Sequence, residues 1–134
     1  MLLALFDRSH IHHSPAMSWW SNHYDGGWAS CPLTQNGLVR IALQKGYARP
    51  AKLADALSVL CGQVAKADHE FWPDDISITD ETLFDHGRIL GPNQITDIYL
   101  LGLAVKNGGR LVTFDRGLPI AAVRGAEARH LVVL

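Results

Sequence analysis

The chain has 134 residues, of which 48% are hydrophobic and 19% are charged, and its 12 basic side chains nearly balance 13 acidic ones. This length suits a single domain over residues 1–134, and the apolar content excludes an intrinsically disordered chain. The formal net charge of −1 excludes a polybasic coat, so any nucleic acid would have to bind at a local patch.

Cysteine usage and hydropathy indicate the cellular compartment. Cys31 and Cys61 are far apart and form no C-x-x-C motif, which fits a reducing environment and indicates neither a disulfide framework nor a zinc site. The apolar run over residues 1–6 is too short for a signal peptide or a membrane span. We therefore expect a cytoplasmic protein that does not enter a membrane.

The first half of the chain predicts helices around a short strand. In chain order we expect a helix near 15–24, a strand over 28–31, a helix capped by Thr34 and ending near Gly46, and a longer helix with Pro50 in its first turn. In the longer helix, apolar side chains recur at helical spacing and form one stripe: Leu53, Leu57, Leu60 and Val64. Cys61 lies in this apolar stretch, so we expect it to be buried.

The second half predicts strands that alternate with helices. We expect extended segments over 69–72 and 76–78, a short helix from Thr79 to Phe84, a helix over 98–105, a strand over 110–114, a short helix over 116–123 and a final strand over 130–134. Such alternation implies right-handed βαβ units and a parallel sheet that is covered on both faces. The predicted fold class is α/β.

Two aspartates are expected to meet at one edge of this sheet. Asp115 follows the strand over 110–114, at the carboxyl end where ligands bind in such folds. Asp97 begins the preceding helix, which runs antiparallel to that strand, so its first turn should lie near the same edge. Two converging carboxylates repel each other, and a hard divalent cation such as Mg²⁺ relieves the repulsion. The alternative is that each aspartate only caps a helix.

Other polar groups offer weaker signals. The dipeptide Thr79-Asp80 repeats Thr96-Asp97, but no strand delivers a second acid beside it, so we expect only a helix start there. The histidines near residue 10 lack metal-ligand spacing and fit a solvated loop. Several scattered cations either form a rim for phosphates or merely solvate the surface: Arg40, Lys45, Arg49, Lys52, Arg110 and Arg116.

Four segments together resemble one family. Residues 94–101 (QITDIYLL) and 110–118 (RLVTFDRGL) resemble the C-terminal half of PIN-domain ribonucleases, and in particular the VapC-type toxins of bacterial toxin–antitoxin pairs. Residues 31–37 (CPLTQNG) and 69–75 (HEFWPDD) are similar to inner segments of that family. The resemblance covers nearly the whole chain.

The resemblance implies a fold and a chemistry. The fold would be a three-layer α/β/α sandwich with a central parallel sheet, and clustered acids would hold Mg²⁺ or Mn²⁺ to hydrolyse RNA, either tRNA or ribosomal RNA. Asp97 and Asp115 match two of those acids, both as metal ligands and as catalytic residues. The implied partners are the RNA substrate, a cognate antitoxin that inhibits the toxin, and a second copy in a homodimer.

The chain departs from the family pattern in two places. Many members place a glutamate in the helix near residues 34–37, where this chain has Gln35 and Asn36. We expect Asn36, together with Thr113 and Arg116, to contact a phosphate or to support the metal site indirectly. Residues 1–7 resemble the family's first helix, so we expect the first strand and its aspartate directly upstream of a misassigned start.

Two other functions remain as alternatives. A PIN-fold protein that has lost acids would be catalytically impaired and would act only as a module that binds antitoxin or RNA. A phospho-acceptor receiver domain also gathers acids at strand ends, but it needs a lysine on a late strand, and no lysine follows Lys106.

Overall fold

The computed structural model describes residues 1–23, 26–47 and 50–134, so Arg49 and the predicted end of a helix at Tyr24 lie outside the described residues. The chain forms two compact units, Met1–Asp74 and Asp75–Leu134. The expectations of a single domain and of an upstream strand stay predictions. No helix in the described part of the chain is long and apolar enough to cross a membrane.

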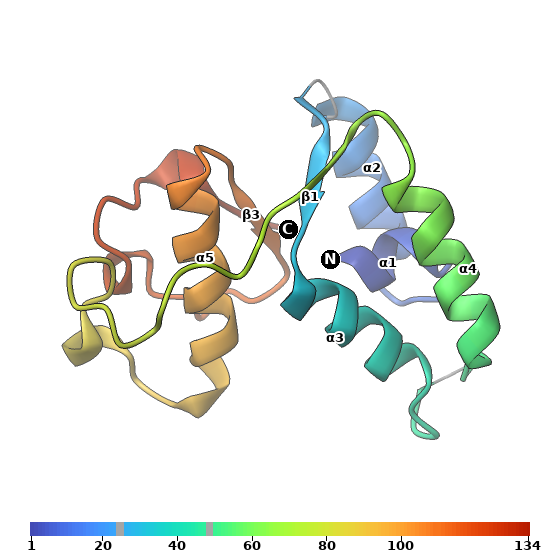
Figure 1. The fold of residues 1–134 in the computed structure, drawn as a ribbon, viewed down its shortest axis with the longest axis horizontal. Coiled ribbons are helices and arrows are strands. Elements are labelled where there is room, and N and C mark those ends of the chain that lie inside the picture. The colour runs from blue at the N-terminus through green and yellow to red at the C-terminus, as the bar shows by residue number, and fades with distance from the viewer. Residues whose placement is uncertain (24–25, 48–49) are drawn as a thin grey trace. The chain divides into compact units, whose positions relative to one another are not determined.

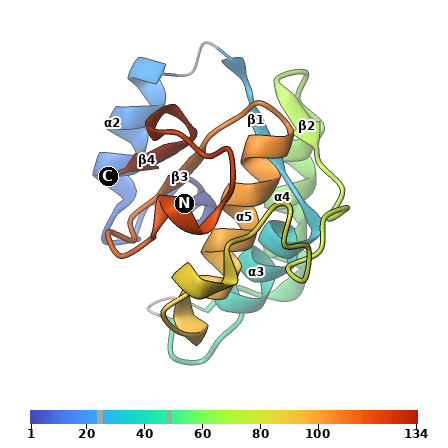
Figure 2. The same cartoon turned by 90° about the vertical axis from the view of Figure 1, so that its left-hand side faces the viewer.

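The first unit combines helices (Figure 1) with a pair of parallel strands, both labelled in Figure 2. Its elements are α1 (Leu2–Phe6), α2 (His13–His23), β1 (Trp28–Ser30), α3 (Pro32–Ala42), α4 (Leu53–Val64) and β2 (His69–Phe71). In the parallel pair, Trp28 lies opposite His69 and Ser30 opposite Phe71. The predicted strands over 28–31 and 69–72 are confirmed, each within a residue.

The start of α3 corrects the predicted role of Thr34. The helix begins at Pro32, whose fixed φ and missing N–H suit the first helical position. Thr34 lies in the first turn, where its hydroxyl oxygen accepts a hydrogen bond of 2.9 Å from the backbone N–H of Cys31. The residue that precedes the helix is Cys31, so the prediction that Thr34 precedes and caps it was wrong by three residues, because proline can open a helix where it cannot continue one.

Helix α4 also differs from its prediction. It begins at Leu53, three residues after Pro50, and its buried positions are Ala56 and Leu60. Cys61 is exposed, which corrects the expectation that it is buried. The reason is helical geometry, since the residue after Leu60 lies about 100° further around the helix and so leaves the buried face. Leu53 and Leu57 of the predicted stripe are likewise exposed.

The second unit places one long helix beside a second parallel pair of strands. Its elements are η2 (His86–Arg88), η3 (Pro92–Gln94), α5 (Ile95–Lys106), β3 (Leu111–Thr113), η4 (Ile120–Ala122), η5 (Ala128–His130) and β4 (Leu131–Val133). Figure 2 shows β3 and β4 side by side, with Leu111 opposite Leu131. The predicted helix and the two predicted strands of this half are confirmed, with shifts of up to three residues at their ends.

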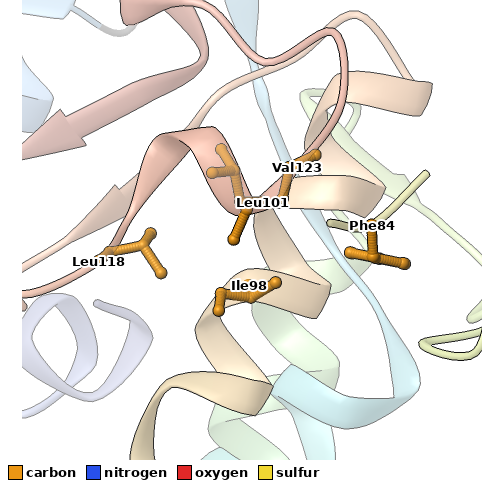
Figure 3. Close-up of a cluster of buried hydrophobic side chains, with 6 residues drawn as sticks. Phe84, Ile98, Leu101, Leu118 and Val123 are labelled. Atoms are coloured by element: carbon orange, nitrogen blue, oxygen red, sulfur yellow. The ribbon is translucent and has the colours of Figure 1, made fainter. Parts of the chain in front are cut away.

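The core of the second unit forms on α5. Figure 3 shows Ile98 and Leu101 of the helix with Leu118 on one side and Phe84 on the other. The cluster consists of Phe84, Ile98, Leu101, Leu118, Ala122 and Val123. Phe84 packs directly against the helix at Gly102, where a Cβ atom would lie 2.7 Å from the Phe84 Cζ atom. A glycine is therefore required at this crossing.

Two short segments of this unit correct the predictions. Residues 79–84 form turns instead of a helix, because the Asp80 side chain binds the backbone N–H of Thr82 at 2.8 Å and fixes a local turn. The predicted helix over 116–123 is reduced to η4, and residues 76–78 form no strand. Phe84 instead forms an isolated antiparallel bridge with Val123.

Candidate active site

Asp97 lies in the first turn of α5. Its neighbour Ile98 is fully buried in the core, and this fixes the rotation of the helix and leaves Asp97 half-buried beside the core. The carboxylate makes no hydrogen bond or ion pair with any described residue of its own unit. Asp97 therefore does not cap α5, which excludes the capping alternative for this one of the two aspartates.

Asp115 follows β3 and is exposed. Its Oδ1 atom accepts a hydrogen bond of 2.7 Å from the backbone N–H of Gly117, which closes a small turn. Its own backbone N–H donates to the Thr113 hydroxyl oxygen at 3.1 Å. One carboxylate oxygen thus fixes the turn, while Oδ2 has no partner among the described residues of this unit and is available to a ligand.

The structure brings the two aspartates into electrostatic contact. Burial raises the pKa of the Asp97 carboxyl above its ordinary value, and the negative charge of Asp115 raises it further. The core explains this proximity, because Ile98 and Leu118, which follow the two aspartates, pack in the same cluster. The unit therefore holds two carboxylates near each other without neutralising them, and a bound cation would relieve that repulsion.

Gln94 connects the segments that carry the two aspartates, and sequence reasoning did not single it out. Its Oε1 atom accepts a hydrogen bond of 3.0 Å from the backbone N–H of Leu90. Its Nε2 atom donates to the backbone carbonyl of Gly117 at 2.8 Å. The only sequence signal was its place three residues before Asp97 in the segment QITDIYLL.

The remaining predicted site residues are less closely tied to the pair. Thr113 supports the Asp115 turn through its hydroxyl group, and Arg116 is exposed inside that turn. Asn36 is exposed on α3 of the first unit, so its role stays a prediction. Among the residues that the structure describes, no group of three or more His, Cys, Asp or Glu side chains could hold a metal ion. The candidate site thus offers two acids.

Comparison with known proteins places the chain in a family. No family model matches it. Ribonuclease VapC44 of Mycobacterium tuberculosis (strain ATCC 25618 / H37Rv) is 44% identical over 134 residues, which cover 100% of this chain and 94% of that relative. The chain belongs to the VapC ribonuclease family.

Two further VapC proteins of the same strain support this assignment. Ribonuclease VapC39 is 35% identical over 126 residues, which cover 93% of this chain and 91% of the relative. Ribonuclease VapC38 is 42% identical over 118 residues, which cover 87% of this chain and 82% of the relative. The fold of a VapC protein is the PIN-like α/β fold, and the helices and parallel strand pairs of both units agree with it.

Proposed function

We propose that this VapC-family ribonuclease is a metal-dependent endoribonuclease toxin that hydrolyses phosphodiester bonds of RNA, with tRNA or ribosomal RNA as substrate. The observation that carries the proposal is a pair of neighbouring carboxylates, Asp97 and Asp115, beside the core of the second unit, of which the Asp97 carboxyl has its pKa raised by burial and by the charge of Asp115. A fold that keeps two like charges together gives up stability there, and such arrangements are concentrated at functional sites.

The donor set fits a hard divalent cation. Both groups supply carboxylate oxygens, which Mg²⁺ and Mn²⁺ both accept, and Mg²⁺ usually keeps waters or substrate phosphates as its other ligands. When bound, such a cation polarises a phosphoryl oxygen and lowers the pKa of water. Two protein ligands suit that use, because they leave positions for the substrate.

The chain's own residues would divide the remaining tasks. Asp97 must be deprotonated to hold a cation, and its raised pKa makes this step sensitive to pH. The backbone N–H of Gly117 holds the Asp115 carboxylate, and the Thr113 hydroxyl oxygen accepts from the backbone N–H of Asp115 in the same turn. Arg116 is exposed next to Asp115, where its guanidinium group can bind a phosphate of the RNA. Asn36 is proposed as a further phosphate contact.

Partners and location follow from the family. We propose that a cognate antitoxin inhibits the protein, that the toxin is a homodimer and that it acts in the cytoplasm. These proposals rest on membership of the VapC family, whose members act in toxin–antitoxin pairs. Co-expression with a candidate antitoxin and size-exclusion chromatography of the purified complex would test the partner and the dimer.

The decisive experiment measures cleavage of total tRNA and ribosomal RNA by the purified protein. We expect cleavage with Mg²⁺ or Mn²⁺, loss of cleavage with EDTA, and recovery when the metal is added back in excess. Asp97→Asn should abolish the metal-dependent product. Cleavage that persists in EDTA, or that Asp97→Asn leaves unchanged, would overturn the proposed metal chemistry.

One observation favours a second candidate function. The described residues hold two acids at the site, and residues 35 and 36 are amides where the family pattern leads us to expect a glutamate. A protein with this deficit would act as a module that binds antitoxin or RNA without cutting. Tight RNA or antitoxin binding together with no metal-dependent cleavage would select this function.

A further inference from the structure

Gln94 lies where it can control the geometry of the proposed metal site. It is the last residue of η3 and directly precedes α5, three residues before Asp97. Its side chain reaches the loop after β3, which is 23 residues further along the chain and carries Asp115. We infer that Gln94 is a positioning residue that holds the Asp115 loop against the start of α5, and this inference rests on the proposed function.

The side chain of Gln94 forms a bridge between two segments of the second unit. The Gln94 amide uses both of its ends, since its oxygen accepts from the Leu90 N–H at 3.0 Å and its nitrogen donates to the Gly117 carbonyl at 2.8 Å. The bond from Leu90 fixes the side chain at its own end of the bridge. The bond to Gly117 then joins the segment before α5 to the loop after β3.

Gly117 is in turn hydrogen-bonded to the Asp115 carboxylate. The carbonyl of Gly117 is held by Gln94, and its N–H donates to Asp115 Oδ1 at 2.7 Å. A movement of Gly117 would therefore carry the Asp115 carboxylate with it. A Cβ atom at Gly117 would lie 3.2 Å from that oxygen, so the two groups are already in close contact.

The loop that carries Asp115 needs such a restraint. Two nearby carboxylates repel each other in the absence of a cation, and an exposed loop would relax away from the helix unless other contacts held it. Leu118, the residue after Gly117, anchors the loop to the core, and the hydrogen bond from Gln94 holds the backbone carbonyl of Gly117. A loop that is already in place costs less to order when the cation binds.

The chemistry explains why the residue is a glutamine. The bridge needs a donor and an acceptor at the end of one side chain, and the amide of asparagine or glutamine provides both. A glutamate could accept from Leu90, but it has no proton for the Gly117 carbonyl and would add a third negative charge. Methionine has nearly the same length and shape without strong hydrogen-bonding groups, so Gln94→Met removes the bridge with little change in volume.

The test compares Gln94→Met with a matched control, Asn107→Ala. Asn107 follows the other end of α5, where its side-chain amide donates to the Leu103 carbonyl at 2.8 Å. Both variants lose side-chain hydrogen bonds at an end of the same helix, but only one touches the Asp115 loop. Circular dichroism and thermal melts establish that each variant is folded and how much stability it has lost.

The first readout requires no metal. Hydrogen exchange of the Gly117 amide in the metal-free protein should be about tenfold faster in Gln94→Met than in the wild type or in Asn107→Ala, because the loop opens more often. Unchanged exchange in Gln94→Met would overturn the inference, whatever the protein does with metals.

The second readout uses Mn²⁺ as a probe, by paramagnetic titration and by RNA cleavage over a range of metal concentrations. For Gln94→Met we expect the half-saturating Mn²⁺ concentration to rise about fivefold to tenfold, while cleavage at saturating metal stays within about twofold of wild type. Asn107→Ala should leave both quantities unchanged. Wild-type protein that binds Mn²⁺ and cleaves RNA with no difference in Gln94→Met would refute the positioning role alone. Wild-type protein without metal binding would refute the proposed function.

Discussion

The same dipeptide occurs twice in the second unit with opposite results. In Thr79-Asp80, the aspartate Oδ1 accepts hydrogen bonds from the N–H and the hydroxyl of Thr82, at 2.8 and 2.6 Å, and these bonds lower its pKa. In Thr96-Asp97, the carboxylate has no hydrogen bond within its unit, and burial together with Asp115 raises its pKa. The carboxylate of Asp80 is therefore hydrogen-bonded locally, whereas that of Asp97 has no hydrogen-bond partner among the described residues of its unit.

The difference arises from the residues that follow each dipeptide. A hydroxyl two residues after Asp80 competes for its carboxylate and closes a turn, so no helix forms there. After Asp97 the chain is apolar, and the burial of Ile98 draws the segment into a helix against the core. A carboxylate without a hydrogen-bond partner in its own segment can interact with a group that is distant in the sequence. The lack of a local hydrogen bond is therefore a better reason to propose a site at Asp97 than the dipeptide itself.

The largest expected effect is a difference in RNA cleavage between variants of Asp97 and Asp80. Asp97→Asn should lower metal-dependent RNA cleavage by about 100-fold or more, because a metal ligand loses its charge. Asp80→Asn should stay within about twofold of wild type, since its carboxylate only holds a turn. Initial rates of cleavage with saturating Mg²⁺ check both variants. Equal losses in the two would remove the functional distinction between the dipeptides.

A second comparison tests the turn that carries Asp115. Gly117→Ala puts a methyl group 3.2 Å from Asp115 Oδ1, so the carboxylate must shift, and cleavage should fall about tenfold. Gly87→Ala is the matched control, because the same Asp-x-Gly spacing there leaves an ordinary contact of 3.5 Å with Asp85 Oδ1. Steady-state rates of both variants decide the matter. A loss of activity in Gly87→Ala as large as that in Gly117→Ala would contradict the argument.

The pKa of Asp97 should change when Asp115 is substituted and should not change when Asp80 is. Asp115→Asn removes the neighbouring charge, so the pKa of Asp97 should fall towards its ordinary value of 3.8 while remaining raised by burial. Asp80→Asn should leave it unchanged. Carbon-detected NMR titration of the aspartate carboxyl groups measures this directly. The metal-dependent cleavage activity of the wild-type protein should increase as the pH rises through the raised pKa of Asp97, because only the ionised carboxylate binds a cation.

The smallest expected effect is on stability, where the substitutions of Asp97 and Asp80 should change the Tm in opposite directions. The folded protein binds a proton at Asp97 more readily than the unfolded chain does, so this group destabilises the fold as the pH rises through its raised pKa. Asp97→Asn should therefore raise the Tm at pH 7 by about 1–3 °C, and the gain should vanish at low pH.

Asp80 should behave in the opposite way. Its lowered pKa stabilises the fold above the ordinary value of 3.8, and this contribution is lost as the pH falls through the lowered pKa. Asp80→Asn should therefore lower the Tm at pH 7 and have little effect in acid. Calorimetric scans at both pH values of the two variants provide the test. Shifts of the same sign at pH 7 would show that the two carboxylates are not electrostatically distinct.

The sequence predicted the elements whose signals are local. The apolar run of α5 and the strands over 111–113 and 131–133 follow from hydropathy and from nearby stop signals. The meeting of Asp97 and Asp115 followed from chain direction alone, since a helix that feeds a parallel strand begins at the edge where that strand ends. These inferences needed no knowledge of side-chain packing.

The failed predictions involve competition between contacts. Thr79 could cap a helix, but the bonds between Asp80 and Thr82 favour a turn, and spacing does not reveal which arrangement is more stable. Cys61 is apolar in character, but it lies beside the buried face of α4 instead of on it. Gln94 was missed because its bond to Gly117 spans 23 residues, and no local pattern announces such a pair.

The contact between Phe84 and Gly102 has a consequence for the evolution of this unit. The aromatic ring occupies the space that any side chain at residue 102 would need, at 2.7 Å from the position of its Cβ atom. A larger residue at 102 therefore requires a smaller one at 84, and the two positions should covary among related sequences. A larger residue at 102 alone would push against Phe84 and disturb the packing of α5, the helix whose first turn carries Asp97. If the candidate site is under selection, that selection would extend to these two buried positions.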